Sequence, residues 1–114
     1  MDTARYDSVL DTQSELPIFE TLQAQGVTYT SAFANAPWTL PSHGGLFSGQ
    51  YSSKHGASAA AKRFSEHTST VVEAFENASY ETVTVSNNTW ISDEFGFARG
   101  FDTFRKNWQY IQSD

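Results

Sequence analysis

The sequence predicts an α/β fold with a mainly parallel sheet. Three observations indicate this class. Candidate helices and strands alternate along the chain, the helices carry apolar residues at helical spacing, and the strands are rich in β-branched and aromatic residues. A chain of 114 residues is one domain or part of one.

The first half of the chain contains two candidate helices and one candidate strand. A helix is predicted over 15–25, because apolar residues recur there every three positions, Ser14 can cap it and Gly26 suits the position after its end. A strand is predicted over 27–33, and a second helix over 40–48. The residues expected on one face of that strand are Val27, Tyr29 and Phe33.

The second half is predicted to be less regular. Residues 50–67 look irregular, an amphipathic helix is expected over 69–78, and a strand over 80–85. Residues 86–104 are rich in Asn, Gly and aromatic side chains and are predicted to be mostly loop. The aromatic residues expected to pack as core are Trp38, Trp90, Phe95, Phe97, Phe101, Phe104, Trp108 and Tyr110.

The composition excludes several classes of protein. Asp and Glu number 13 against 7 Lys and Arg, a net charge of −6, which argues against nucleic-acid binding. The acidic balance suits a salt-loving organism or simply good solubility. The chain has no cysteine, hence no disulfide framework, and no apolar run long enough to span a bilayer, so we expect no membrane segment and a cytoplasmic location.

The run from Ala36 to Gly49 is the most informative stretch. It sets the hydroxyl of Thr39 beside Pro41, which is tolerated in the first turn of a helix, and Gly49 closes the run. The first turn of a helix has N–H groups without intrahelical acceptors and carries partial positive charge, which suits a phosphate or sulfate group. On spacing alone, however, an ordinary helix cap is the favoured interpretation of Thr39.

The run Thr39-Leu40-Pro41-Ser42-His43, followed by Leu46-Phe47-Ser48-Gly49, resembles the nucleophile motif of the sulfatase family, within the alkaline phosphatase superfamily. That motif reads Cys or Ser, any residue, Pro, Ser, Arg, and then a small-residue helix ending in Leu-x-x-Gly. Three further stretches that resemble the family follow its order: 2–5, 19–33 and 96–104. The resemblance therefore extends over almost the whole chain.

The resemblance implies a partial alkaline-phosphatase-like sandwich. Sulfatase-like catalytic domains are several times longer, so we expect residues 1–114 to be the N-terminal part of such a domain, with the first strand and the C-terminal part missing. No apolar strand precedes Asp2, although a site residue in an open α/β sheet normally follows a strand. We expect this piece to be inactive by itself.

The family also implies a chemistry. Thr39 corresponds to the nucleophile, and Asp2 to one ligand of a divalent metal ion (Ca, Mg, Mn or Zn) whose other ligands lie elsewhere. Sulfatases convert Cys or Ser at this position into formylglycine, and oxidation of threonine would give a ketone instead. No formylglycine is therefore expected, and the prediction shifts towards phosphoryl transfer by an unmodified hydroxyl on a small anionic ester.

Other positions depart from the family pattern. His43 stands where the family has Arg and can hydrogen-bond Thr39 or the substrate, or merely pack or cap. Asn87 and Asn88 replace a Lys- and His-containing segment that binds substrate, and they can donate to a phosphoryl oxygen or serve the loop. We expect His55 to have a surface or turn role and His67 to be solvated.

Two function classes remain open on the sequence. One is a metal-dependent hydrolase of sulfate or phosphate esters, with Thr39 and His43 catalytic and Asn87 and Asn88 on the substrate. The other is a non-catalytic, truncated α/β fragment. A phosphotransferase or phosphoglycerate-mutase-like member of the superfamily uses the same constellation.

Overall fold

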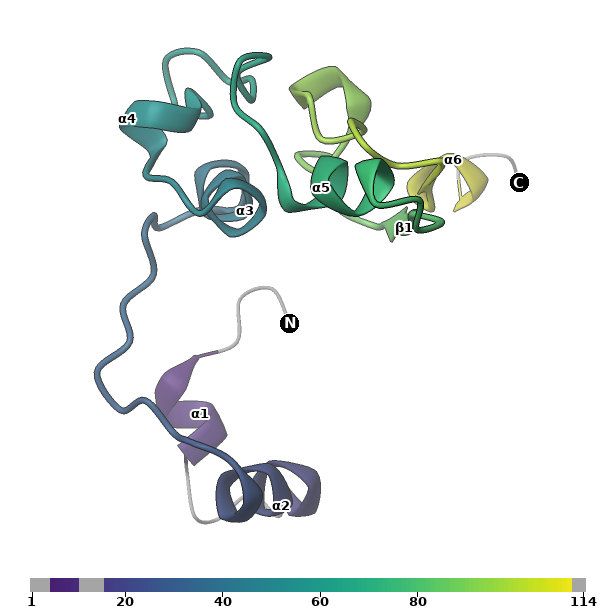
Figure 1. Ribbon diagram of the computed structural model, residues 1–114. Coiled ribbons are helices and arrows are strands. Elements are labelled where there is room, and N and C mark those ends of the chain that lie inside the picture. The colour runs from purple at the N-terminus through teal and green to yellow at the C-terminus, as the bar shows by residue number, and fades with distance from the viewer. Residues whose placement is uncertain (1–4, 11–15, 112–114) are drawn as a thin grey trace. The chain divides into compact units, whose positions relative to one another are not determined.

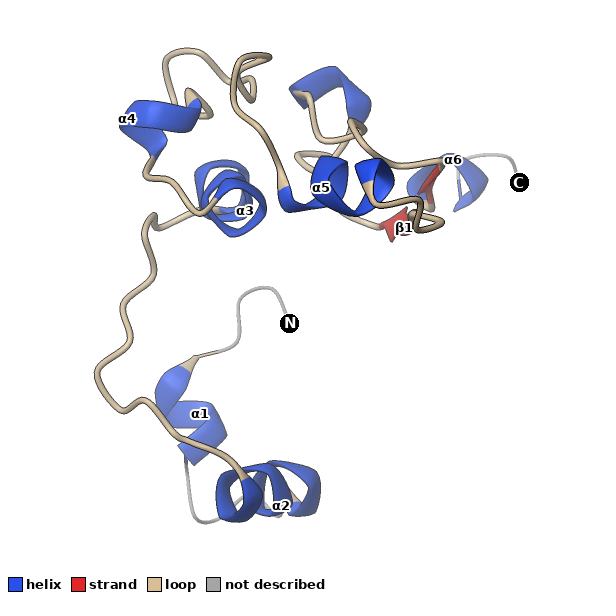
Figure 2. Cartoon of the chain, viewed as in Figure 1, coloured by secondary structure: helices blue, strands red, loops and turns tan. Residues whose placement is uncertain are grey.

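The computed structural model describes residues 5–10 and 16–111 (Figures 1 and 2). The chain divides into two compact units, Met1–Phe33 and Ala34–Asp114. In the described residues of the first unit the regular elements are helices. The second unit contains the sheet and the other helices. No helix in the described ranges has the length and apolar character needed to cross a membrane.

The first unit contains helices α1 (Tyr6–Leu10) and α2 (Pro17–Gln25). The prediction of α2 is confirmed, with Pro17 in the first turn, where a missing N–H costs nothing. The predicted cap Ser14 lies outside the described residues. The short helix α1 was not predicted.

The predicted strand over 27–33 is wrong. These residues are irregular, and the side chains of Val27, Tyr29 and Phe33 are exposed. Alternating residue types favour a strand only where a neighbouring strand accepts its hydrogen bonds, and the structure pairs no strand with this segment. Residues 27–33 therefore have strand propensity but, among the described residues, no neighbouring strand.

Three helices form the first part of the second unit: α3 (Thr39–Ser48), α4 (Ser52–His55) and α5 (Val71–Asn77). The predictions of α3 and α5 are confirmed, whereas α4 lies in a stretch predicted to be irregular. Helix α3 ends at Gly49, whose φ of 67° lets its N–H reach the carbonyl of Gly45 at 2.8 Å. Thr70 and Glu73 begin α5 with reciprocal hydrogen bonds, a capping box.

The sheet has two parallel strands, β1 (Val83–Ser86) and β2 (Thr103–Lys106), drawn in red in Figure 2. Val83 lies opposite Thr103, and Ser86 opposite Lys106. The 3₁₀ helix η1 (Asp93–Phe95) lies in the crossover, and α6 (Trp108–Ile111) follows β2. The parallel α/β class is confirmed. The predicted loop over 86–104 is wrong at its end, because Thr103 and Phe104 belong to β2.

The hydrophobic core joins α3 to the crossover between the strands. Its buried members are Leu40, Ala57, Phe64, Ile91 and Phe97. Partly buried side chains packed against it are Trp38, Phe47, Trp90, Phe95 and Phe104. The expected core role of Trp38, Trp90, Phe95, Phe97 and Phe104 is thus confirmed. Phe64, which lies in the irregular stretch, was missed, although it is the largest fully buried side chain of the core.

Asp102 connects the starts of the two strands. Its carboxylate accepts hydrogen bonds from the N–H (2.9 Å) and the hydroxyl (3.0 Å) of Thr82, and the Asp102 N–H donates to that hydroxyl at 3.0 Å. The Thr82 hydroxyl also lies 2.6 Å from the carbonyl of Gly100. These bonds hold the residue before β1 against the residues that lead into β2.

The Thr82 N–H, and after it the Thr82 hydroxyl, lower the pKa of Asp102 from its ordinary 3.8. The folded state therefore favours the carboxylate. Its contribution to stability is complete above pH 3.8 and is lost as the pH falls through the lowered value. We expect D102N to be less stable than the natural protein at pH 7, with the difference shrinking on acidification. Urea unfolding between pH 7 and 3 measures this, with E81Q, at an exposed neighbouring carboxylate, as control. An equal difference at both pH values would contradict it.

Candidate functional site

The beginning of α3 presents the hydroxyl of Thr39. Trp38 has extended backbone angles (φ −149°, ψ 164°), and Thr39 is the first helical residue and half-buried. The N–H of Ser42 donates to the carbonyl of Trp38 at 3.3 Å, and Pro41 before it has no N–H. Leu40, fully buried, anchors this turn in the core. The sequence therefore places a hydroxyl at the positive end of a ten-residue helix that the core holds in position.

His43 lies one turn after Thr39, as its spacing predicts. Its Nδ1 is 3.0 Å from the main-chain carbonyl oxygen of Thr39. A carbonyl can only accept, so Nδ1 carries the proton and donates it. In the neutral ring, Nε2 is then unprotonated and can accept a proton or a hydrogen bond. The contact that the structure shows is thus with the backbone of Thr39, and it fixes the tautomer of His43.

The loop after β1 lies beside the beginning of α3. The rings of Trp38 and Trp90 meet edge to face with centroids 5.2 Å apart, so the residues before Thr39 and the residues after Asn88 are neighbours. This loop follows the carboxyl end of β1, the edge where ligand sites of parallel sheets form. The structure therefore brings two of the predicted site segments together.

Asn88 holds this loop in shape. Its side-chain oxygen accepts the N–H of Trp90 at 3.0 Å, and its own N–H donates to the hydroxyl of Ser86 at 3.3 Å. The loop role that the sequence allowed is therefore present in the structure. Asn87 next to it is exposed.

The predicted metal ligand Asp2 lies outside the described residues. The part of the chain that the structure describes contains no group of three or more His, Asp or Glu side chains able to hold a metal ion. Divalent cations prefer several oxygen ligands, so the described donors do not by themselves form such a site.

The expectation for His55 was a surface or turn role. The surface role is wrong, because the side chain of His55 is fully buried at the end of α4. Its ring lies against Gly44 of α3, where a Cβ atom would come within 2.6 Å of it. A glycine in the middle of α3 was the sequence signal for this close approach. His67 is exposed, as predicted.

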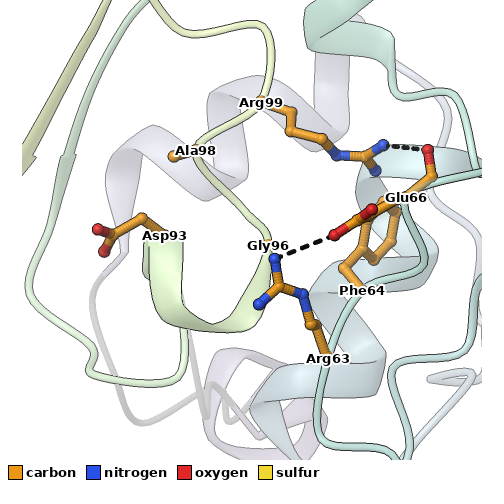
Figure 3. Close-up of a pocket in the computed structure, with 7 residues that line it drawn as sticks. All are labelled: Arg63, Phe64, Glu66, Asp93, Gly96, Ala98 and Arg99. Atoms are coloured by element: carbon orange, nitrogen blue, oxygen red, sulfur yellow. Dashed lines mark hydrogen bonds and ion pairs between the residues drawn. The ribbon is translucent and has the colours of Figure 1, made fainter.

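A separate hollow of about 350 Å³ lies between the crossover and the stretch after α4 (Figure 3). Arg99 crosses it and donates to the main-chain carbonyls of Ser65 (3.0 Å), Glu66 (2.9 Å) and Thr68 (2.9 Å). Arg63 pairs with the Glu66 carboxylate at 3.3 Å. The Arg99 guanidinium thus holds the crossover against the stretch after α4, whereas the Arg63–Glu66 pair lies within that stretch. Of the predicted site residues that the structure describes, none lines the hollow.

Ligand sites of parallel α/β folds form at the carboxyl ends of the strands, and the start of a helix favours an anionic group. The family model for sulfatases matches residues 1–114, so the chain belongs to the sulfatase family, a family of hydrolases. Comparison with curated proteins and with solved structures gave no match.

Proposed function

We propose that this chain carries the nucleophile segment of a hydrolase that cleaves small anionic esters, with Thr39 as the nucleophile. The observation that supports the proposal is the position of Thr39 as the first residue of α3, within a run that resembles the nucleophile motif of the sulfatase family. The helix dipole favours negative charge at this point.

The proposed step forms a bond between Oγ of Thr39 and the phosphorus of a phosphate ester, while the bond from phosphorus to the leaving alcohol breaks. The proton of the threonine hydroxyl passes to a base, and Nε2 of His43 is the candidate because Nδ1 is already a donor. Water then cleaves the phosphothreonine and frees phosphate. Asn87, exposed on the neighbouring loop, is proposed to donate to a phosphoryl oxygen. Asn88 is proposed to shape that loop.

Two further elements of the proposal come from the family. A divalent cation, held in part by Asp2, would neutralise charge on the transferred group. A phosphate ester is favoured over a sulfate ester because threonine cannot give formylglycine. The cation depends on Asp2, which lies outside the described residues, whereas the choice of ester depends on Thr39.

Paired assays with an aryl phosphate and an aryl sulfate test the substrate class. We expect the full-length protein to hydrolyse the phosphate faster and to lose activity on treatment with a chelator, with recovery on adding back Mg²⁺, Mn²⁺, Ca²⁺ or Zn²⁺. Faster hydrolysis of the sulfate would overturn the choice of ester. Activity that is unaffected by chelation would contradict the proposed metal dependence but not the proposed role of Thr39 as nucleophile.

A further inference from the structure

His55 is the buried titratable group that the proposed chemistry does not use. Its ring has no exposed surface and lies between Gly44 of α3 and Phe64, whose ring stacks on it with centroids 5.6 Å apart and planes 23° apart. Helix α3 contacts α4, of which His55 is the last residue. The imidazole thus fills the space between the proposed nucleophile helix and the core.

One protonation state suits this position. The N–H of Ala57 donates to Nδ1 at 3.1 Å, so Nδ1 must be unprotonated and the neutral ring carries its proton on Nε2. Among the described residues Nε2 has no hydrogen-bond partner, and the backbone of Pro41 acts to raise the pKa of the ring. A second proton would have to go on Nδ1, where it would break the bond with Ala57.

The charges around the ring do not compensate a cation there. Arg99 lies 5.2 Å from the centre of the Phe64 ring that stacks on His55, and its charge is shared with Glu73 at 3.8 Å. The titratable side chain of α3 is His43, and that of α4 besides His55 is the exposed Lys54. The remaining charged or titratable side chains of the segment after α4 are exposed; they are Lys62, Arg63, Glu66 and His67.

We propose that neutral His55 positions α3 on the core, and that its protonation releases α3, so that the helix bearing Thr39 is held in place only above a threshold pH. The inference rests on the packing and hydrogen bonding of His55, so it stands whether or not Thr39 is a nucleophile.

The direction of the pH effect follows from the pKa of His55. Burial lowers this pKa from its ordinary 6.5, and backbone groups of His55 and Pro41 oppose the shift only in part. The unfolded chain therefore takes up a proton at a higher pH than the folded chain does. The stabilisation is complete above pH 6.5 and falls as the pH drops towards the lowered value. One proton gives at most a tenfold change in the opening equilibrium for each pH unit, about 1.4 kcal/mol.

Hydrogen exchange of the α3 amides in the full-length protein, corrected for intrinsic rates, tests this between pH 7.5 and 5. We expect protection of residues 42–48 to fall by up to about tenfold per pH unit below pH 6.5. H55N supplies an amide oxygen for the Ala57 N–H and cannot take up the proton, so its protection is expected to be independent of pH. H67N, at the exposed histidine, should behave as the natural protein does.

The ring resonances of His55 provide the second measurement. These resonances report the protonation of His55 separately from that of the other histidines. They test the proposal in the natural protein if H55N does not fold. Titration of His55 below 6.5, accompanied by loss of α3 protection, supports the proposal. Constant α3 protection across this range, an equal slope in H55N, or titration of His55 with α3 still protected would overturn it.

Discussion

Replacing Thr39 by alanine is expected to lower kcat/KM of the full-length protein for an aryl phosphate by at least about 10⁴-fold, because the substitution removes the attacking oxygen. Thr39 is half-buried at the first position of α3, and its main chain is fixed by the core through Leu40. Loss of the side chain should therefore leave the fold intact. Steady-state kinetics and circular dichroism of the same samples measure both properties.

Thr39→Ser is the matched control. Serine keeps the hydroxyl at the same place and loses only a methyl group, so substantial activity should remain. A phosphorylated peptide containing residue 39 should be trapped by acid quenching in the natural protein and in T39S, and never in T39A. Equal activity of T39A and the natural protein would show that Thr39 is not the nucleophile. Absence of activity from the natural protein itself would leave the non-catalytic alternative.

Replacing Phe64 by alanine is expected to cost about 3–5 kcal/mol of unfolding free energy, a large part of the stability of a small domain. Phe64 is 1% exposed and contacts His55, Phe97 and Arg99 through its ring. Truncation would leave a cavity at the point where α4, the crossover and the stretch between α4 and α5 meet. Urea or thermal unfolding measures the loss.

Phe75→Ala is the control for Phe64. The side chain is 49% exposed and contacts Tyr80 at the surface, with ring centroids 5.4 Å apart. The same truncation there should cost about 1 kcal/mol or less. Equal losses for the two variants would show that the buried position of Phe64 does not determine stability.

Local chemistry predicted α2, α3 and α5 and missed the short helices α1 and α4. The spacing of apolar residues marked α2 and α5, and Gly49 marked the end of α3. Each signal acts within one or two turns, so the sequence carries it without help from the rest of the fold. The strands were predicted less well. Residues 27–33 and 103–106 both have strand propensity, but of these two segments 103–106 is the one that pairs with another strand, β1.

The candidate site shows the same division. The motif and its spacing placed Thr39 and His43 on one helix, and the contact between Nδ1 of His43 and the Thr39 carbonyl agrees with that spacing. Nothing in the order of residues predicted that Trp90 would meet Trp38, or that Asn88 would hold its own loop. These are contacts between distant or irregular segments, whose geometry depends on how the core packs.

The sequence by itself determined the family, the helix that begins with a threonine, and the α/β class, since motifs and the alternation of elements along the chain encode them. Only the tertiary structure decided that His55 is buried and that the loop after β1 lies beside the start of α3. The physical reason is that burial and neighbourhood depend on which surfaces exclude water together, and residues far apart in the chain contribute to each such surface.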